Sequence, residues 1–322
     1  MRIFIQSPNI NSRHGGIRVI NEWANRLEQF GHNVYLFNQQ GLLSCNWMNI
    51  TCKIINNQAL LNKCDCLIVT SPHGAYLLDK DRPAKKFIFL QMLEHLFNQK
   101  NNRFYNDCMK LYQSKYPLIS ISQWNIRQLQ HKFGRKGITK YVGNGINLTD
   151  FPIVKAKKNG QVILLESPEP TNDTKDVDKI AVKVAYMLKE QGYLIKGYGI
   201  QIPKDNIYTE YIVKPDLTQL NRLYEEATIM IKATKYDARS TSPLEAMTKG
   251  TVTVRGIIEG DDDLNDENSY KTGYSFDKVL DSALFALNNK SDLEDKARYC
   301  RHYVQNYTWD YWMNQINKIL IS

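Results

Sequence analysis

Two carboxylates eight positions apart mark the segment best suited to bind a ligand rich in hydroxyl groups. Asp237 precedes a polar loop, and Glu245 follows that loop in the first turns of a predicted helix. A folded loop can bring both side chains to one pocket, where carboxylates accept hydrogen bonds from the vicinal hydroxyls of a sugar or ribose. The pattern is equally typical of an acid near a helix N-terminus beside a turn-forming aspartate.

The loop between the two acids offers groups that bind phosphate. Arg239, Ser240, Thr241 and Ser242 can present backbone N–H groups and hydroxyls to a diphosphate. Pro243 suits the first turn of the helix, because the N–H that proline lacks would be unpaired there. The segment therefore predicts a strand, an anion-binding loop and a helix.

A second candidate for phosphate binding lies near the N-terminus, where Gly15 and Gly16 separate an apolar run from a helical pattern. Paired glycines let the backbone approach a ligand, and the N–H groups at a helix start attract anions. Arg18 can add positive charge there, although it can equally face solvent. A tight turn also needs glycine, and the spacing is not the G-x-G-x-x-G of dinucleotide-binding proteins.

Short apolar runs alternate with amphipathic helical patterns along the chain and predict two parallel sheets. In the first half, we expect strands at 2–7, 32–38, 64–71, 85–91 and 117–123, with helices at 15–31 and 122–134. In the second half, we expect strands at 161–167, 194–199, 207–213, 228–234 and 251–256. Helices are expected at 176–193, 216–227, 242–250, 278–289, 292–306 and 309–320. Such alternation forms right-handed βαβ units, whose ligands bind at the carboxyl ends of the strands.

The charge of the chain is unevenly distributed. Residues 1–150 hold 19 of the 42 Lys and Arg but only 8 of the 33 Asp and Glu, a net charge of +11. The rest of the chain holds 23 basic against 25 acidic residues, a net charge of −2. This asymmetry indicates that the first half meets an anionic partner such as a membrane surface, a phosphate-rich glycan or nucleic acid. A merely solvated basic surface would give the same count.

The six cysteines and the N-terminal segment favour a reduced, cytoplasmic protein. The cysteines lack paired C-x-x-C spacing, and Cys64 and Cys66 fit the start of a buried strand better than a metal site. The first ten residues have only a strand-length apolar run, unlike a signal peptide. The sequence also lacks a run of about 18 apolar residues, so we expect no transmembrane helix.

The order of these segments resembles that of the retaining nucleotide-sugar glycosyltransferases of family 4 (glycosyl transferases group 1). The family signature is an acidic residue, seven residues and then Glu, which here becomes DARSTSPLEAMTKG (237–250). Five further segments match in the same order, so that the resemblance spans nearly the whole chain: GGIRVINEWANRL (15–27), FLQMLEHLF (89–97), ISQWNIRQL (121–129), VGNGINLTDF (142–151) and NYTWDYWMNQINKIL (306–320).

The resemblance implies an α/β protein of GT-B architecture, with two Rossmann-like, doubly wound domains that face each other across a cleft. Residues 1–152 would bind the acceptor and residues 153–305 the nucleotide-sugar, while residues 306–322 would form a helix that packs back on the N-terminal domain. The protein would be cytoplasmic, or peripheral at the inner membrane surface.

The resemblance also implies roles for residues. Glu245 would hold the ribose hydroxyls of the donor, and Asp237 the hydroxyls of the transferred sugar. Backbone N–H groups of residues 240–242 would hold the diphosphate, which Gly16 would allow the first domain to approach. Lys175 would stabilise the charge that grows on the leaving diphosphate, where stabilisation speeds the reaction most.

The chain departs from the family pattern in two places. The first acid is Asp where the family has Glu, and the usual loop glycines are replaced by Ala238, Arg239 and Ser240. The strand at 161–167 leads into Ser-Pro where the family has Gly-Arg, so a phosphate-binding arginine is missing there. Arg239 or Arg18 are the candidate substitutes.

Acceptor-side candidates lie in the first half. His73 follows a predicted strand at a position that family members place near the donor sugar, and Gln91 and Glu94 belong to a segment that can face the acceptor. A solvated helix start explains Glu94 equally well. We expect no metal or other cofactor. The sequence has no Asp-x-Asp motif where a metal-bound diphosphate would need one, and the run Asp261 to Asp263 is typical of a turn. Retention without a covalent nucleophile would proceed by front-face departure and attack.

The sequence therefore predicts transfer of a sugar from a nucleotide-diphosphate sugar to a hydroxyl of a glycan or lipid-linked glycan. A glycosyltransferase acting on modified DNA bases fits the basic first half as well. A nucleotide-sugar epimerase and an inactive nucleotide-sugar-binding protein share the architecture and remain alternatives, since fold alone does not fix function. The oligomeric state is left open.

Overall fold

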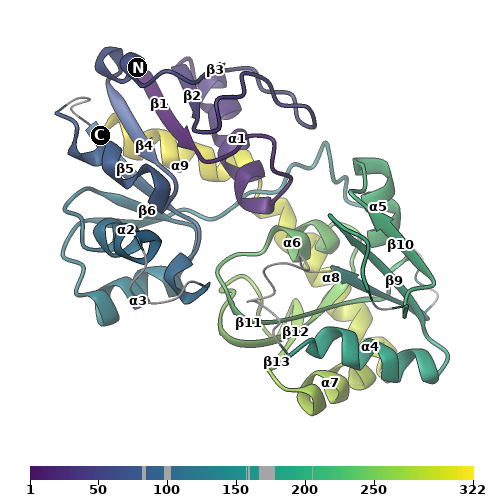
Figure 1. The fold of residues 1–322 in the computed structure, drawn as a ribbon. Coiled ribbons are helices and arrows are strands. Elements are labelled where there is room, and N and C mark those ends of the chain that lie inside the picture. The colour runs from purple at the N-terminus through teal and green to yellow at the C-terminus, as the bar shows by residue number, and fades with distance from the viewer. Residues whose placement is uncertain (82–84, 98–102, 157, 159, 167–177, 205) are drawn as a thin grey trace. The chain divides into compact units, whose positions relative to one another are not determined.

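The computed structural model describes residues 1–81, 85–97, 103–156, 158, 160–166, 178–204 and 206–322. The chain divides into two compact units (Figure 1). The first unit comprises Met1–Asn144 and Asp310–Ser322, and the second comprises Gly145–Trp309. Within the described ranges, no helix is both long and apolar enough to span a membrane.

The first unit is built on a parallel sheet whose strand order is β3-β2-β1-β4-β5-β6-β7. Its strands are β1 (Arg2–Ser7), β2 (Asn33–Asn38), β3 (Lys53–Ile55), β4 (Cys66–Val69), β5 (Lys85–Leu90), β6 (Leu118–Ser120) and β7 (Thr139–Tyr141). The five strands expected from apolar runs are confirmed. The three-residue strands β3 and β7 were not predicted, because neither contains an apolar run long enough to be recognised.

The helices of the first unit are α1 (Gly15–Gln29), α2 (Arg103–Tyr112) and α3 (Gln123–Phe133), with the short 3-10 helices η1 (Gln58–Lys63), η2 (Pro72–Asp79) and η3 (Glu94–Phe97). Among them, α3 begins and ends at residues that carry clear local signals. Before α3, the Ser122 hydroxyl accepts hydrogen bonds from the backbone N–H groups of Trp124 and Asn125. Gly134 ends α3 with φ of +58°, a left-handed conformation that glycine adopts at low cost. Both predicted caps of α3 are confirmed.

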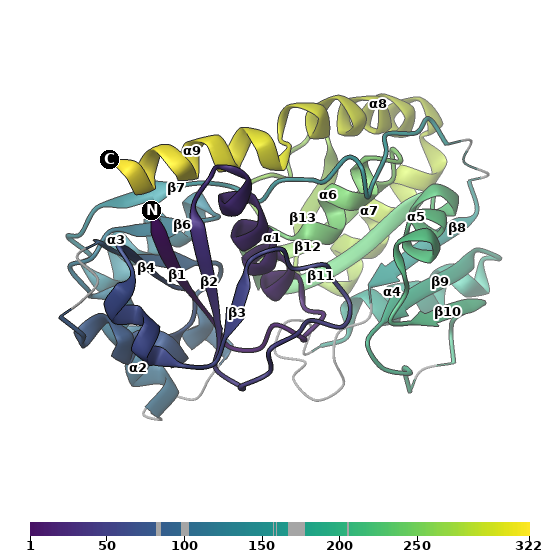
Figure 2. The same ribbon diagram turned by 90° about the horizontal axis from the view of Figure 1, so that it is seen from above.

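The helix α9 (Trp309–Ile321) returns to the first sheet from the far end of the sequence (Figure 1). His32 Nε2 and Asn317 Oδ1 are 2.7 Å apart, and Lys85 Nζ donates to the Leu320 carbonyl at 3.1 Å. Figure 2 shows α9 running beside β7. The rings of Trp312 in α9 and Tyr141 in β7 meet edge to face, with centres 5.3 Å apart. The first unit is thus completed by residues more than 160 positions away from the rest of it.

The second unit contains another parallel sheet, with strand order β10-β9-β8-β11-β12-β13. Its strands are β8 (Val162–Glu166), β9 (Leu194–Gly199), β10 (Glu210–Val213), β11 (Ile229–Asp237), β12 (Val252–Gly260) and β13 (Ser269–Gly273). Strands β11 and β12 run beyond their predicted ends at 234 and 256, so Asp237 is the last residue of a strand. The order reverses direction between β8 and β11, and ligands of doubly wound sheets bind at such a reversal.

Two groups of helices cover this second sheet on opposite faces (Figure 1). The helices α4 (Ile180–Glu190) and α7 (Phe276–Asn288) pack on each other and on β11. The other group consists of α5 (Leu217–Glu226), α6 (Thr241–Met247) and α8 (Lys290–Asn306), which contact one another through α6. Helix α5 opens with a capping box between Asp216 and Gln219, and α6 begins at Thr241, with Pro243 in its first turn. The two doubly wound sheets confirm the predicted fold class.

Residues 145–152 contact the second unit, although the sequence led us to place them in the first domain. Ile146 N donates to the Tyr307 carbonyl at 3.1 Å, and Trp309 N donates to the Ile146 carbonyl at 3.3 Å. Further along, Lys249 Nζ donates to the Pro152 carbonyl at 2.6 Å. The contacts therefore change from one unit to the other at residue 144, earlier than the end of the segment that resembles the family linker.

Candidate functional site

The two carboxylates singled out in the sequence lie beside the strand reversal of the second sheet. Asp237 ends β11, and Glu245 lies in α6, the helix that follows the short loop 238–240. Both side chains are buried, with residue exposures of 6% each. Strand pairing and helix start thus bring the predicted loop to the carboxyl edge of β8 and β11.

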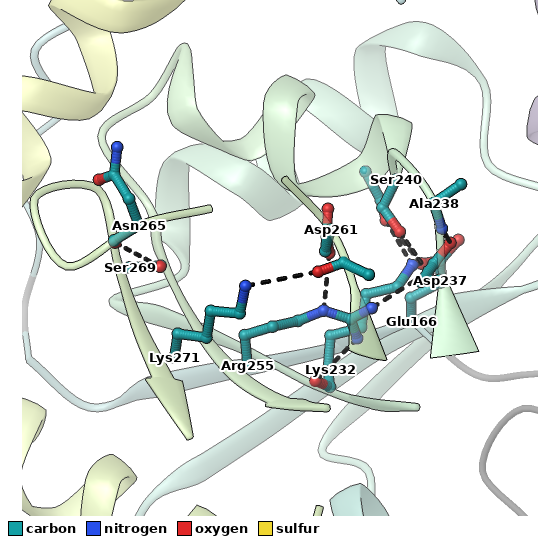
Figure 3. A network of polar contacts seen from close by, with 12 residues as sticks. Glu166, Lys232, Asp237, Ala238, Ser240, Arg255, Asp261, Asn265, Ser269 and Lys271 are labelled. Carbon is teal, nitrogen blue, oxygen red and sulfur yellow. Dashed lines mark hydrogen bonds and ion pairs between the residues drawn. The ribbon is translucent and has the colours of Figure 1, made fainter. Parts of the chain in front are cut away.

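The carboxylate of Asp237 organises the loop that follows it (Figure 3). Its Oδ2 accepts a hydrogen bond from Ser240 Oγ at 2.5 Å, and its Oδ1 accepts one from the backbone N–H of Ala238 at 3.0 Å. Ser240 is the N-cap residue of α6, so its hydroxyl serves Asp237 and makes no side-chain cap bond. Asp237 therefore fixes the path of the chain between β11 and α6.

Arg255 of β12 supplies the positive charge that Asp237 needs in a buried place. Its Nη2 lies 3.2 Å from Asp237 Oδ2, and its Nε lies 2.7 Å from Asp261 Oδ2 (Figure 3). The Arg255 side chain is fully buried, and it also donates to the Lys232 carbonyl at 3.1 Å. Burial raises the pKa of Asp261 and the neighbouring Asp237 carboxylate adds to the rise, while Arg255 opposes it. One guanidinium thus holds two buried acids.

Glu245 ends a chain of hydrogen bonds that begins on β9. Tyr224 OH donates to Glu245 Oε2 at 3.0 Å, and the hydroxyls of Tyr198 and Tyr224 are 2.8 Å apart. Burial raises the pKa of both tyrosines well above the ordinary value, so both remain neutral donors. Glu245 is consequently held in one orientation by α5 and β9, which the sequence did not indicate.

A second charged group lies where β8 ends. Lys232 Nζ donates to Ser242 Oγ at 3.0 Å and forms an ion pair with Glu166, the last residue of β8. Ser242 Oγ in turn donates to Glu166 Oε2 at 2.6 Å. These contacts join the end of β8, the middle of β11 and the first turn of α6, so an ammonium group lies next to the predicted diphosphate loop.

Arg239, one of the two candidate substitutes for the missing phosphate-binding arginine, faces an internal partner. Its guanidinium forms an ion pair with Asp263 and lies 5.9 Å from the centre of the Tyr307 ring. Tyr303 OH donates to the same Asp263 carboxylate at 3.0 Å. In the acidic run 261–263, Asp261 therefore pairs with Arg255 and Asp263 with Arg239, while Asp262 is exposed.

In the first unit, the structure brings the glycine pair and Gln91 together. Gln91 Nε2 donates to the Gly16 carbonyl at 2.9 Å, and a Cβ placed on Gly16 would meet Gln91 Oε1 at 3.3 Å. Asn125 Nδ2 donates to the Gln91 carbonyl at 3.3 Å. Gly15 and Arg18 lie in the first turn of α1, exposed and half-buried respectively. Gln91 therefore connects the start of α1 to α3.

The remaining acceptor-side candidates of this unit differ in environment. His73 is an exposed residue of η2, and its ring lies 5.0 Å from that of Phe104. Glu94 opens η3, where burial raises its pKa from 4.5 to about 7. Its charge acts on Cys108 and Tyr112 of α2. Glu94 is thus a partly buried carboxyl group whose pKa lies near neutrality, as those of functional carboxyl groups often do.

Replacing Glu94 with Gln is expected to change how stability depends on pH. Because the folded pKa of Glu94 is about 7 against the ordinary 4.5, the folded protein retains a proton that the unfolded chain releases between these values. Stability therefore falls as pH rises from 4.5 to about 7. At about pH 8 the variant should be more stable than wild type by at most about 3 kcal/mol, and near about pH 4 the difference should vanish. Urea unfolding at both pH values measures this, with exposed Glu190→Gln as control. A constant difference would contradict the assignment.

Several site residues stand outside the sequence prediction or outside the described residues. Lys175 lies outside the described ranges. The partners Glu166, Lys232 and Arg255 were missed, although each is a charged residue in or at the end of an apolar strand pattern, a signal that marks buried ions.

Across the described parts of the chain, no three His, Cys, Asp or Glu side chains gather to hold a metal ion. All six cysteines are free thiols.

Comparison with known proteins identifies the architecture through structure and not through sequence. No protein-family model and no curated protein matches the sequence. Sucrose-phosphate synthase from Thermosynechococcus elongatus is similar with a TM-score of 0.78 and 12% identity, over 99% of this chain and 98% of that one. A glycosyltransferase from Rickettsia africae gives a TM-score of 0.71 and 15% identity, over 99% and 97% of the two chains.

HepE from Anabaena, solved in complex with UDP-glucose, gives a TM-score of 0.75 and 11% identity, over 100% of this chain and 99% of that chain. Each of these matches spans both units of the present chain from end to end. Similarity at identities this low concerns the arrangement of helices and strands. The chain resembles these proteins throughout, and it has the GT-B fold of two Rossmann-like units.

Proposed function

We propose that this protein is a retaining glycosyltransferase of family 4 that moves a sugar from a nucleotide-diphosphate sugar to an acceptor hydroxyl. The observation that carries the proposal is the placement of Asp237 and Glu245 at the strand reversal of the second sheet, within a GT-B fold. Doubly wound sheets bind nucleotides at this position. The structural neighbour HepE was solved with UDP-glucose, which supports a nucleotide-sugar as donor.

In this proposal, Glu245 accepts hydrogen bonds from the ribose hydroxyls of the donor. The bond from Tyr224 occupies one oxygen of the carboxylate and orients the other, since a carboxylate has about four acceptor positions. Backbone N–H groups of residues 240–242 and the Ser242 hydroxyl contact the diphosphate. Asp237, which accepts hydrogen bonds from Ala238 and Ser240 and pairs with Arg255, contacts a hydroxyl of the transferred sugar.

A thermal-shift screen with UDP-, GDP- and TDP-sugars tests the donor site. We expect one donor to stabilise the wild type, since a ligand that binds only the folded state raises its stability. Glu245→Ala should weaken that binding about tenfold or more, the loss expected for hydrogen bonds to a charged group. Glu245→Gln keeps an acceptor for Tyr224 and should bind with intermediate affinity. Glu294→Ala on the exposed side of α8 is the matched control. If no nucleotide-sugar shifts the wild type, the donor site is wrong.

We propose that the reaction retains anomeric configuration without a metal ion or a covalent nucleophile. Departure of the diphosphate and attack of the acceptor would occur on the same face of the sugar. Lys175, and the dipoles and cations of the loop, would stabilise the charge on the leaving group. NMR of the product should show the anomeric configuration of the donor, with a rate that EDTA leaves unchanged. An inverted product would exclude this mechanism.

We propose an anionic glycan or lipid-linked glycan at a membrane surface as the acceptor, met by the first unit. The support is the net charge of +11 on residues 1–150, because each basic residue near an anionic membrane adds about 1 kcal/mol of attraction. Binding to vesicles with anionic lipid should exceed binding to neutral vesicles and should weaken with salt. Retention on DNA without affinity for anionic vesicles would instead favour a modified DNA base as acceptor.

A further inference from the structure

The pairing of β8 with β11 ends at a charged pair. The last paired residues are Leu165 and Ile231, so Glu166 and Lys232 follow at the same level of the sheet. Beyond this point β8 ends, while β11 continues to Asp237 and pairs with β12 alone. Lys232 and Glu166 therefore lie where the strand order reverses, and both side chains are drawn in Figure 3.

Lys232 is an unusual residue for this strand. Its neighbours Met230, Ile231 and Ala233 are buried at 3% exposure or less, and its own side chain is only 14% exposed. Placing an ammonium group there costs free energy unless partners offset the lost hydration. The Glu166 carboxylate is such a partner, yet it is the more exposed member of the pair at 35%. A lysine that served only to pair with this carboxylate would contribute little to the stability of the fold, because partly exposed ion pairs are weak.

The third member of the group connects the pair to the predicted diphosphate loop. Ser242 Oγ accepts from Lys232 Nζ at 3.0 Å and donates to Glu166 Oε2 at 2.6 Å. The carboxylate oxygen is thus bound by one ammonium and one hydroxyl, the donors that also bind a phosphate oxygen. A phosphate oxygen in its place would keep both hydrogen bonds and the local charge balance.

We propose that Lys232 is a cation that binds the donor diphosphate in this protein, and that Glu166 occupies that anion position until the donor displaces it. The inference rests on the proposed function. In it, Lys232 replaces the phosphate-binding arginine that is missing after residues 161–167. Arg239, one of the two substitutes suggested by the sequence, is engaged with Asp263 and Tyr307. Donor binding then exchanges one anion for another at Lys232, and the Glu166 carboxylate turns to solvent.

Binding of a nucleoside diphosphate and of the corresponding nucleoside, measured by calorimetry, separates this contact from the rest of the site. The nucleotide is the one that stabilises the wild type in the donor screen. Lys232→Met should weaken diphosphate binding about tenfold or more, as expected for a lost charge-assisted hydrogen bond, and leave nucleoside binding unchanged. Glu166→Gln should tighten diphosphate binding about two- to fivefold, because a weak competing pair is removed.

A neighbouring ion pair provides the matched control. Lys235 Nζ lies 3.4 Å from Asp178 Oδ2, three residues further along β11. Lys235→Met and Asp178→Asn make the same changes in charge as the two test variants, so they correct for long-range electrostatic effects. Both should change diphosphate affinity less than the corresponding test variant does. Equal effects from the two pairs would overturn the assignment to Lys232.

The double variant Glu166→Gln/Lys232→Met guards against loss of folding, since it leaves neither charge unpaired. It should unfold near the wild-type temperature and still bind the diphosphate about tenfold or more weakly. Wild-type diphosphate affinity in this variant would overturn the inference while the donor site stands. If the wild type binds neither a nucleoside diphosphate nor inorganic pyrophosphate, the proposed function and this inference both fail.

Discussion

Replacing Arg255 with methionine is expected to lower the free energy of unfolding by about 3–5 kcal/mol, because it leaves buried carboxylates without their cation. Arg255 is fully buried and contacts both Asp237 and Asp261. Methionine fills part of the volume but offers no charge and no donor. Urea unfolding of the two proteins measures the loss. Donor binding should weaken as well, since Asp237 would lose the partner that orients it.

Two further variants show whether the loss comes from the buried network. Arg298 forms an exposed pair with Asp295, at 76% side-chain exposure, so Arg298→Met should change stability by no more than about 0.5 kcal/mol. Adding Asp261→Asn to Arg255→Met should recover part of the lost stability, because it removes one of the two buried charges that paired with Arg255. A loss from Arg255→Met no greater than that of the exposed control would show that the buried charges do not depend on this arginine.

Replacing Gly260 with alanine should destabilise the protein by about 2–6 kcal/mol, which combines backbone strain with overpacking. Gly260 ends β12 with φ of +113°, a conformation that residues with a side chain rarely adopt. A Cβ there would overlap the carbonyl oxygen of Asp237, its partner across the β11–β12 pair. That oxygen also accepts from the backbone N–H of Asp261 at 2.9 Å. The two strand ends must separate, and Asp237 must move with them.

Gly192 offers a control for the conformational part of this effect. It has φ of +91°, but a Cβ there would meet nothing within 4 Å. Gly192→Ala should therefore cost only the strain, about 1–3 kcal/mol, and leave donor binding intact. Denaturant unfolding and calorimetric donor binding should separate the two variants. Equal losses of stability together with normal donor binding in Gly260→Ala would contradict a role for this close approach in placing Asp237.

The sequence predicted those elements whose hydrophobic pattern is long enough to be unambiguous. Strands such as β1, β5 and β8 are apolar runs buried on both faces, and α3 carries signals at both ends. The missed strands β3, β7 and β13 are short or polar, since their partners in the sheet determine them more than their own residues do. The ends of β11 and β12 were also missed, because polar residues continue both strands into the site.

The candidate site was predicted in part for a related reason. Spacing alone pointed to Asp237 and Glu245, since both lie near one loop in the sequence. The charged partner of Asp237 comes from another strand, since Arg255 lies in β12. The neighbouring ion pair also joins two strands, because Glu166 ends β8 and Lys232 lies in β11, 66 residues later. Sequence shows that such charges fall in apolar patterns, but which charge meets which depends on strand order. The sequence therefore predicted contacts within one loop, but it could not predict contacts between strands.

The return of α9 to the first sheet has a consequence for biosynthesis. The ribosome makes residues 310–322 only after the whole of the second unit, so the nascent first unit lacks α9 while residues 145–309 emerge. During that time the surface that Asn317 and Trp312 later cover stays open to water or chaperones. The two ends of the second unit are joined through Ile146 and Tyr307. This unit is therefore an insertion that folds while the first unit is still incomplete. Slow folding of the second unit would therefore appear first as aggregation of the first.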